Sequence, residues 1–183
     1  ALVQAPGRIT LFHLDSAKAA GIYSAYFMAT AQIALAIVNM IHAVLIPLSS
    51  RAQGQRNAWK ALKSVTPGHI AALAAGFGLA AWLAFFFMGR SYPMRWVWLI
   101  PFAVSAAFIL LHGVIAAVFA ARDLRGLYIS IGGSLTAGLG NFLFNLLLTP
   151  TWGMTGAAIS LSLGYGAGLV WYAFNYPKVE VAS

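Results

Sequence analysis

Four long stretches of the chain contain no Asp, Glu, Lys or Arg, and they restrict the fold more than any other feature. They cover residues 19–50, 64–89, 96–121 and 126–177. A helix needs about 20 apolar residues to cross a bilayer, so each of the first three stretches accommodates one crossing. The apolar runs are continuous rather than alternating, which argues against strands.

The fourth stretch is long enough for two helices. Its break is expected at residues 149–153, Thr-Pro-Thr-Trp-Gly, where proline and glycine interrupt the apolar pattern. The sequence therefore predicts an all-α integral membrane protein with about five transmembrane helices. The predicted spans lie near residues 21–48, 68–89, 97–120, 128–148 and 155–176.

The composition supports a membrane protein over a soluble one. Charged residues make up 8% of the 183 residues, against roughly 25% in soluble domains. Apolar residues make up 61%, which also excludes disorder. The net charge of +8 comes from few, dispersed basic residues, so no nucleic-acid partner is expected. The absence of cysteine excludes disulfides and thiolate sites.

The basic residues predict the orientation. The loop 49–66 carries four of them and no acid: Arg51, Arg56, Lys60 and Lys63. Placing this loop in the cytoplasm also places Arg122, Arg125 and Lys178 there, and leaves Arg8, Lys18, Arg90 and Arg95 outside. The positive-inside rule then makes residues 177–183 a cytoplasmic tail of a multi-pass membrane protein.

The same loop has the pattern of a short amphipathic helix lying on the membrane surface. Trp59, Leu62 and Val65 recur every three residues between the basic ones. The four basic residues of the loop are candidates for contact with lipid headgroups or with the phosphates of a lipid-linked substrate. The alternative is that they determine topology alone.

Polar residues inside the predicted spans form two groups. Gln32, Asn39 and His42 lie near one stripe of the first span, and Asn141 and Asn145 share a face of the fourth. Polar groups at membrane depth are costly and usually face a bundle interior or a wet cavity. The first group is a candidate for lining a substrate cavity, and interhelical hydrogen bonding is the alternative.

Rows of small residues predict close packing between helices. The rows are Ala72, Gly76 and Ala80; Gly132, Thr136 and Gly140; and Gly164 with Gly168.

Neither an enzyme nor a metal site is expected. The spans contain no ionised residue, and His13, His42, His69 and His112 are scattered over separate elements. Paired acid and base groups or a cluster of metal ligands are missing, so we expect no catalytic residues, cofactor or metal.

Two stretches resemble polysaccharide flippases of the multidrug/oligosaccharidyl-lipid/polysaccharide (MOP) exporter superfamily. Residues 21–50 are similar to a helix of the form G-Y-x-x-A…P-x-S. Residues 141–165 look like the late helix–turn–helix motif of the group. The matching positions there are Asn141, Asn145, Pro150, Gly153, Gly156, Ala157 and Ala158.

This resemblance implies a MOP/MATE-like twelve-helix transporter, of which this chain supplies most of the C-terminal lobe. Residues 1–20, which do not begin with methionine, then represent the end of a preceding helix and a loop. The missing N-terminal lobe is an expected partner, together with the lipid bilayer.

The implied function is the flipping of undecaprenyl-linked oligosaccharides across the bacterial inner (plasma) membrane by alternating access. Lipid II flippases tend to carry a cation where this chain has Tyr26, Phe27 and Met28. That departure favours O-antigen, capsule or exopolysaccharide repeat units as substrate. Two alternatives stay open: a cation-coupled multidrug antiporter of the same superfamily, and a non-transporting scaffold for glycan assembly.

Overall fold

Seven helices make up the part of the chain that the computed structural model describes, which is residues 6–49, 52–88 and 93–175. No strand occurs in this part. The helices are α1 (Pro6–Leu14), α2 (Ala17–Ala29), α3 (Ala31–Ser49), α4 (Ala52–Lys63), α5 (Pro67–Met88), α6 (Trp96–Ala120) and α7 (Leu124–Asn175). Among the described residues, four helical runs are long and apolar enough to cross a membrane: Ala17–Pro47, Pro67–Met88, Trp96–Ala120 and Leu124–Asn175.

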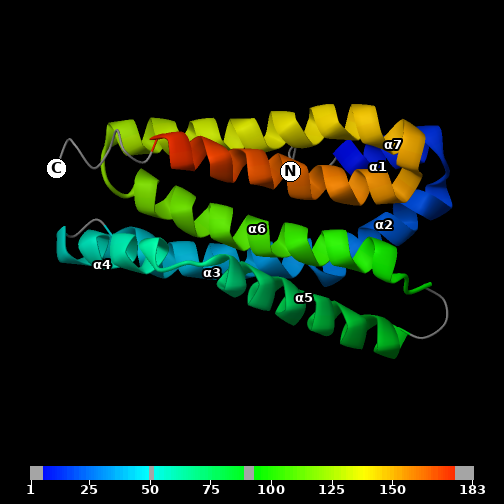
Figure 1. The fold of residues 1–183 in the computed structure, drawn as a ribbon, viewed down its shortest axis with the longest axis horizontal. Coiled ribbons are helices and arrows are strands. Elements are labelled where there is room, and N and C mark those ends of the chain that lie inside the picture. Colours follow the sequence, from blue (N-terminus) through cyan, green and yellow to red (C-terminus); the bar gives the residue numbers. More distant parts are fainter. Residues whose placement is uncertain (1–5, 50–51, 89–92, 176–183) are drawn as a thin grey trace.

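Helix α7 folds back on itself into two antiparallel halves (Figure 1). The reversal occurs at Gly153, whose φ of 54° lies in the left-handed region that favours glycine. Pro150 remains inside the helix, so the turn is narrower than the predicted 149–153 break. Helical segments therefore cover most of the described residues in each of the five ranges that the sequence predicts as spans.

Glycines let the two halves of α7 approach closely. A Cβ atom at Gly164 would lie 2.6 Å from the backbone nitrogen of Asn141, and one at Gly168 would lie 3.0 Å from the carbonyl oxygen of Gly133. On the first half, Gly132 packs beneath the ring of Trp171. Because lipid provides no hydrophobic drive for helices to associate, such close van der Waals packing is a main source of stability.

Helix α6 is the central helix of the bundle. It packs against α7 on one side and against α3 and α5 on the other (Figure 1), and residues along most of its length are buried. The crossing with α3 is tight at Gly113, where a Cβ atom would lie 2.5 Å from the side chain of Val38.

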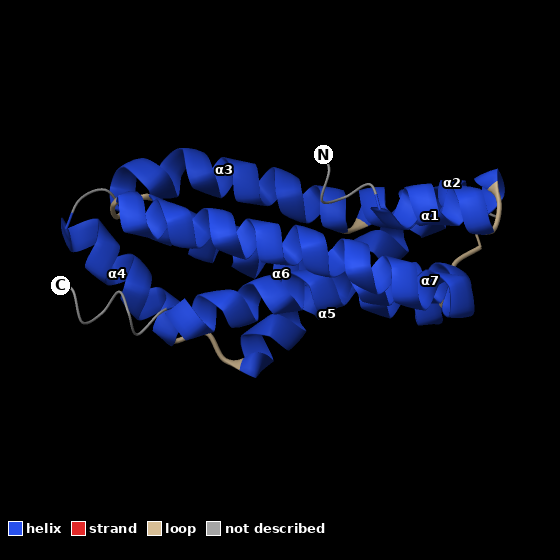
Figure 2. Ribbon diagram, turned by 90° about the horizontal axis from the view of Figure 1, so that it is seen from above, coloured by secondary structure: helices blue, strands red, loops and turns tan. Residues whose placement is uncertain are grey.

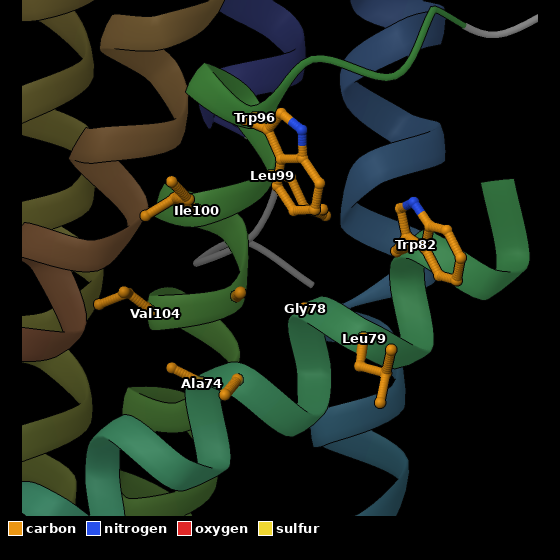
Figure 3. A pocket seen from close by; sticks show the side chains of 10 residues that line it. Ala74, Gly78, Leu79, Trp82, Trp96, Leu99, Ile100 and Val104 are labelled. Carbon is orange, nitrogen blue, oxygen red and sulfur yellow. The ribbon is translucent and has the colours of Figure 1, made fainter. Parts of the chain in front are cut away.

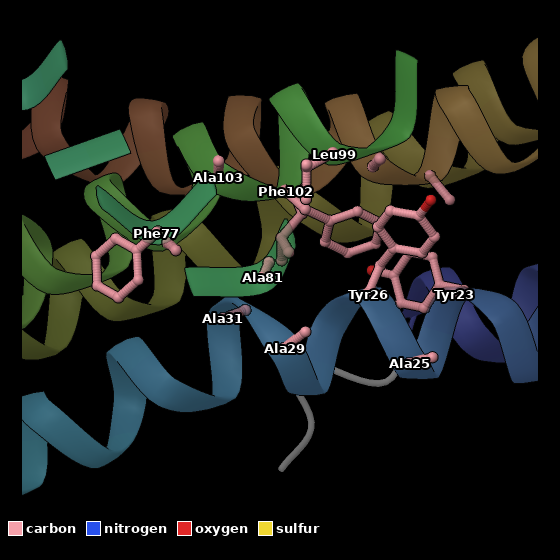
Figure 4. Packing of buried hydrophobic residues seen from close by; sticks show 14 of the residues in the cluster. Tyr23, Ala25, Tyr26, Ala29, Ala31, Phe77, Ala81, Leu99, Phe102 and Ala103 are labelled. Atoms are coloured by element: carbon pink, nitrogen blue, oxygen red, sulfur yellow. The ribbon is translucent and has the colours of Figure 1, made fainter. Parts of the chain in front are cut away.

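An aromatic cluster joins α2, α5 and α6 near the loop between the last two. Figure 4 shows Tyr23 and Tyr26 projecting from α2 toward Phe102 of α6. The Tyr26 ring also contacts Phe85 of α5, with 4.5 Å between ring centroids. Its hydroxyl donates to the carbonyl of Pro93 (2.9 Å) and accepts from the backbone N–H of Arg95 (2.7 Å). One tyrosine thus ties three helices and a loop together.

From this cluster α3 and α5 diverge. Both pack on α6, and within the described residues they do not pack on each other. Figure 2 shows α4 crossing the open end, from the end of α3 to the start of α5. The described parts of α3 and α5 therefore form the two arms of a V that lies on α6. The arms meet at the aromatic cluster and are farthest apart at α4.

The outer face of α7 is a stripe of leucines. Leu135, Leu139, Leu143 and Leu146 are exposed on its first half, whereas Ala137 on the opposite side is buried. Exposed apolar stripes of this kind are expected where a helix faces lipid.

The first predicted span differs from a single helix over 21–48. Helical structure begins at Ala17 and is interrupted at Thr30, which has φ −129° and ψ −78°. The buried Thr30 hydroxyl donates to the carbonyl of Tyr26 (2.7 Å). Residues 6–14 form α1, which packs on α2 and α7, and the connecting turn is only two residues long. The predicted tail, residues 177–183, lies outside the described residues.

Replacing Gly164 with alanine should destabilise the bundle by about 1–3 kcal/mol, because the new methyl group meets backbone atoms that cannot move aside. Unfolding of the purified protein by titration with SDS measures this change. Gly76→Ala is the matched control, since a Cβ atom there meets nothing within 4 Å. Equal stability of the two variants would contradict the close packing of the two halves of α7.

Candidate substrate-facing site

Helix α3 carries a stripe of polar and small residues on its exposed side. Gln32, Ala36, Asn39 and Ala43 are all exposed and lie three or four residues apart, so they share one face. Gln32 lies two residues after the break at Thr30. The two amides predicted to line a cavity thus share an accessible face, which we call the α3 polar stripe (Gln32, Ala36, Asn39 and Ala43).

His42 does not belong to this stripe in the structure. It is half-buried, and its Nε2 atom donates to the carbonyl of Gly113 on α6 at 2.9 Å. This bond lies one turn from the tight contact between Val38 and Gly113. The geometry favours the alternative interpretation for His42, which is interhelical hydrogen bonding.

Helix α4 presents its cations at the open end of the V. Lys60 and Lys63 are exposed in its last turn. The half-buried Trp59 anchors the helix by packing edge-on against Phe119 of α6, with ring centroids 5.0 Å apart. Arg51 lies outside the described residues, and Arg56 lies within α4 but its side chain is not described.

The asparagines of the predicted motif form a buried ladder along α7. The Asn145 amide nitrogen donates to the backbone carbonyl (2.9 Å) and side-chain oxygen (2.8 Å) of Asn141. The hydroxyl of Thr149 donates to the Asn145 side-chain oxygen at 3.0 Å. All three residues are buried. The ladder leads to the turn at Gly153, and Gly156 packs against the carbonyl of Leu148 across that turn. These motif residues therefore shape the hairpin rather than an accessible site.

Some polar contacts were missed by sequence reasoning. Ser105 of α6 and Ser162 of α7 lie with their hydroxyl oxygens 2.8 Å apart, and both donate to the carbonyl of Pro101. Single serines in apolar helices give no periodic signal, so only the packing of the helices reveals the pair.

His112 is buried between two tyrosine rings. The centroids of Tyr165 and Tyr172 lie 5.4 and 5.1 Å from that of the imidazole. Neither the α3 polar stripe nor the end of the bundle at α4 includes this residue, so the structure places it in the packing between α6 and α7.

Two apolar grooves flank α5. One, of about 640 Å³, lies between α5 and α6 and includes Leu79, Trp82 and Trp96 (Figure 3). The other, of about 670 Å³, lies inside the V between α3 and α5, and its lining includes Phe77 of α5 and Leu111 of α6. We call these the α5–α6 groove and the α3–α5 groove. In a bilayer both offer apolar surface to hydrocarbon chains.

Within the described ranges, no three His, Asp or Glu side chains lie close enough to hold a metal ion. What the arrangement offers chemically is recognition: amides on α3, cations on α4 and apolar grooves beside α5.

Comparison with protein-family models, with curated proteins and with solved structures finds no match for this chain.

Replacing Asn145 with alanine should lower stability by about 1–3 kcal/mol, because the buried Asn141 amide oxygen and Thr149 hydroxyl lose their partner. Thermal unfolding in detergent measures the loss. Thr151→Ala is the control, since the Thr151 hydroxyl is exposed and bonds only to its own helix. An Asn145 variant as stable as that control would show that the ladder contributes nothing to the hairpin.

Proposed function

We propose that this chain is the C-terminal lobe of a transporter that flips lipid-linked oligosaccharides across the bacterial inner membrane. The observation that carries the proposal is the exposure of Gln32 and Asn39 on an otherwise apolar helix. A polar side chain at membrane depth costs free energy unless water, a polar ligand or another protein segment meets it.

Amide side chains suit a sugar ligand. Each amide offers a donor group and an acceptor oxygen, and sugar hydroxyls require both. The small residue Ala36 lies between the amides and Ala43 lies one turn beyond Asn39, which leaves room for a bulky polar group. The α3 polar stripe is therefore one wall of the proposed sugar-binding cavity.

The interruption at Thr30 supports a transport role. Discontinuous membrane helices are typical of transporters, whose substrate sites lie near the bilayer midplane beside such breaks. Thr30 lies near the middle of the run Ala17–Pro47, and the stripe begins two residues later.

The cations of α4 are suited to binding the phosphate part of the substrate. Lys60 and Lys63 are exposed at one end of the bundle, and ammonium groups attract both anionic headgroups and substrate phosphates. The similarity of residues 141–158 to the MOP exporter motif is consistent with this assignment. Rocking of this lobe against a second lobe would expose the cavity to each side in turn.

The double variant Gln32→Leu/Asn39→Leu should reduce transport about tenfold or more, since each lost hydrogen bond contributes about 1 kcal/mol. The full-length protein is expressed in a strain lacking its polysaccharide flippase. Surface polysaccharide and accumulated lipid-linked repeat units are then measured. Because both amides are exposed, the amount of folded protein should not change.

The matched control is Met40→Leu/Val44→Leu, which changes exposed apolar positions of the same helix that do not line the α3–α5 groove. Transport by the amide variant at the level of this control would refute the role of the stripe. Failure of the full-length wild-type protein to restore polysaccharide export would refute the proposed function itself.

A further inference from the structure

The α3–α5 groove, of about 670 Å³, lies where α3 and α5 diverge on the surface of α6 (Figure 2). Its walls are apolar: Ile33 and Ile37 of α3 lie on one side and Leu73 of α5 on the other. Leu111 of α6 contributes to its lining. In a bilayer, a gap of this polarity is filled by hydrocarbon rather than by water.

The end of this groove nearest α4 is polar, and it lies beside the last turn of α4, which carries Lys60 and Lys63. Ser64, Val65 and His69 line it there. Lys63 directly precedes Ser64, and the backbone N–H of Ser64 bonds to the carbonyl of Lys60. The sequence holds no Asp or Glu between residues 16 and 122, so α3 and α5 place no acid beside the cations of α4.

Two further charged residues lie at this end of the bundle, in the turn between α6 and α7. Asp123 pairs with Arg122 at 3.4 Å and accepts the backbone N–H of Gly126 at 2.6 Å. The Asp123 carboxylate is thus engaged by its own turn. The mouth of the groove therefore favours an anionic group, while the groove itself favours an apolar chain.

We propose that the α3–α5 groove binds the isoprenoid tail of a polyprenyl phosphate carrier, with the phosphate at Lys60 and Lys63. This inference rests on the proposed function and deepens it, because it assigns the lipid part of the substrate to a surface separate from the α3 polar stripe.

The row of small residues on the α5 wall of the groove favours a branched chain over an unbranched one. Ala72, Gly76 and Ala80 follow one another at one-turn spacing along its α5 wall, and all are exposed. They form a row of recesses, and an isoprenoid chain carries methyl branches at regular intervals that fit such recesses. From Ile70 to Ala80 the wall is about 15 Å long at 1.5 Å per residue, roughly half the hydrocarbon thickness.

Photocrosslinking tests the proposal. Full-length protein in vesicles is exposed to undecaprenyl phosphate carrying a photoreactive diazirine in its tail, and labelled residues are identified by mass spectrometry. We expect labels on α3 and α5 at the groove, displaced by undecaprenyl phosphate but not by an unbranched alkyl phosphate or a diacyl phospholipid.

Filling the groove should reduce this labelling. Gly76→Leu should reduce it about tenfold, because the side chain enters space where a Cβ atom meets nothing within 4 Å. Ala75→Leu, which lines the α5–α6 groove on the same helix, is the matched control and should label normally. Lys60→Gln/Lys63→Gln should weaken labelling, whereas Arg95→Gln should not.

Undiminished labelling of Gly76→Leu, or equal displacement by the unbranched phosphate or the diacyl phospholipid, would overturn the proposal. Transport is measured on the same proteins, so that the groove assignment and the proposed transport function can be refuted independently. A wild-type protein that transports without groove labelling refutes only the groove assignment. One that is labelled in the groove but does not transport refutes the proposed function.

Discussion

The hydrocarbon interior of a bilayer supplies no hydrogen-bond partners, and this constraint organises the polar residues of the bundle. Ser24, Thr30, Ser105, Thr136 and Ser160 each donate a hydroxyl hydrogen bond to the carbonyl four residues earlier. In α7, the side chains of Asn141, Asn145 and Thr149 likewise satisfy one another by hydrogen bonds four residues apart. The amides of Gln32 and Asn39 differ from these groups because they are exposed on the surface of α3. This exposure is the reason for proposing that the α3 polar stripe faces a ligand.

The positions of the helices were largely predictable from the sequence, because charges are excluded from runs of membrane length. The turn at Gly153 was predictable too, since proline and glycine interrupt an otherwise uniform apolar stretch. The break at Thr30 was not predictable, because threonine is compatible with a continuous helix and its hydroxyl bonds within the helix. Tertiary packing, not local propensity, decides where such a helix is interrupted.

The candidate site was predictable only in part. Helical phase placed Gln32 and Asn39 on one face correctly, but it also included His42, which the crossing with Gly113 draws into a hydrogen bond. Small-residue rows on α7 do mark close packing, whereas the row on α5 lines an open groove. Spacing alone cannot distinguish these cases, because the difference lies in where the neighbouring helix runs. The contacts of Tyr26 hold the end of α5 near α2, whereas the start of α5 lies away from α3.

The proposed transport role requires these helices to cross a membrane, with α4 and the turn before α7 on one side. The chain has no cysteine, so single cysteines at Lys60, Arg125 and Thr151 report their own accessibility. All three positions are exposed. A membrane-impermeant maleimide should label the first two only from the cytoplasmic side and the third only from the opposite side. Labelling of all three from the same side would contradict the account.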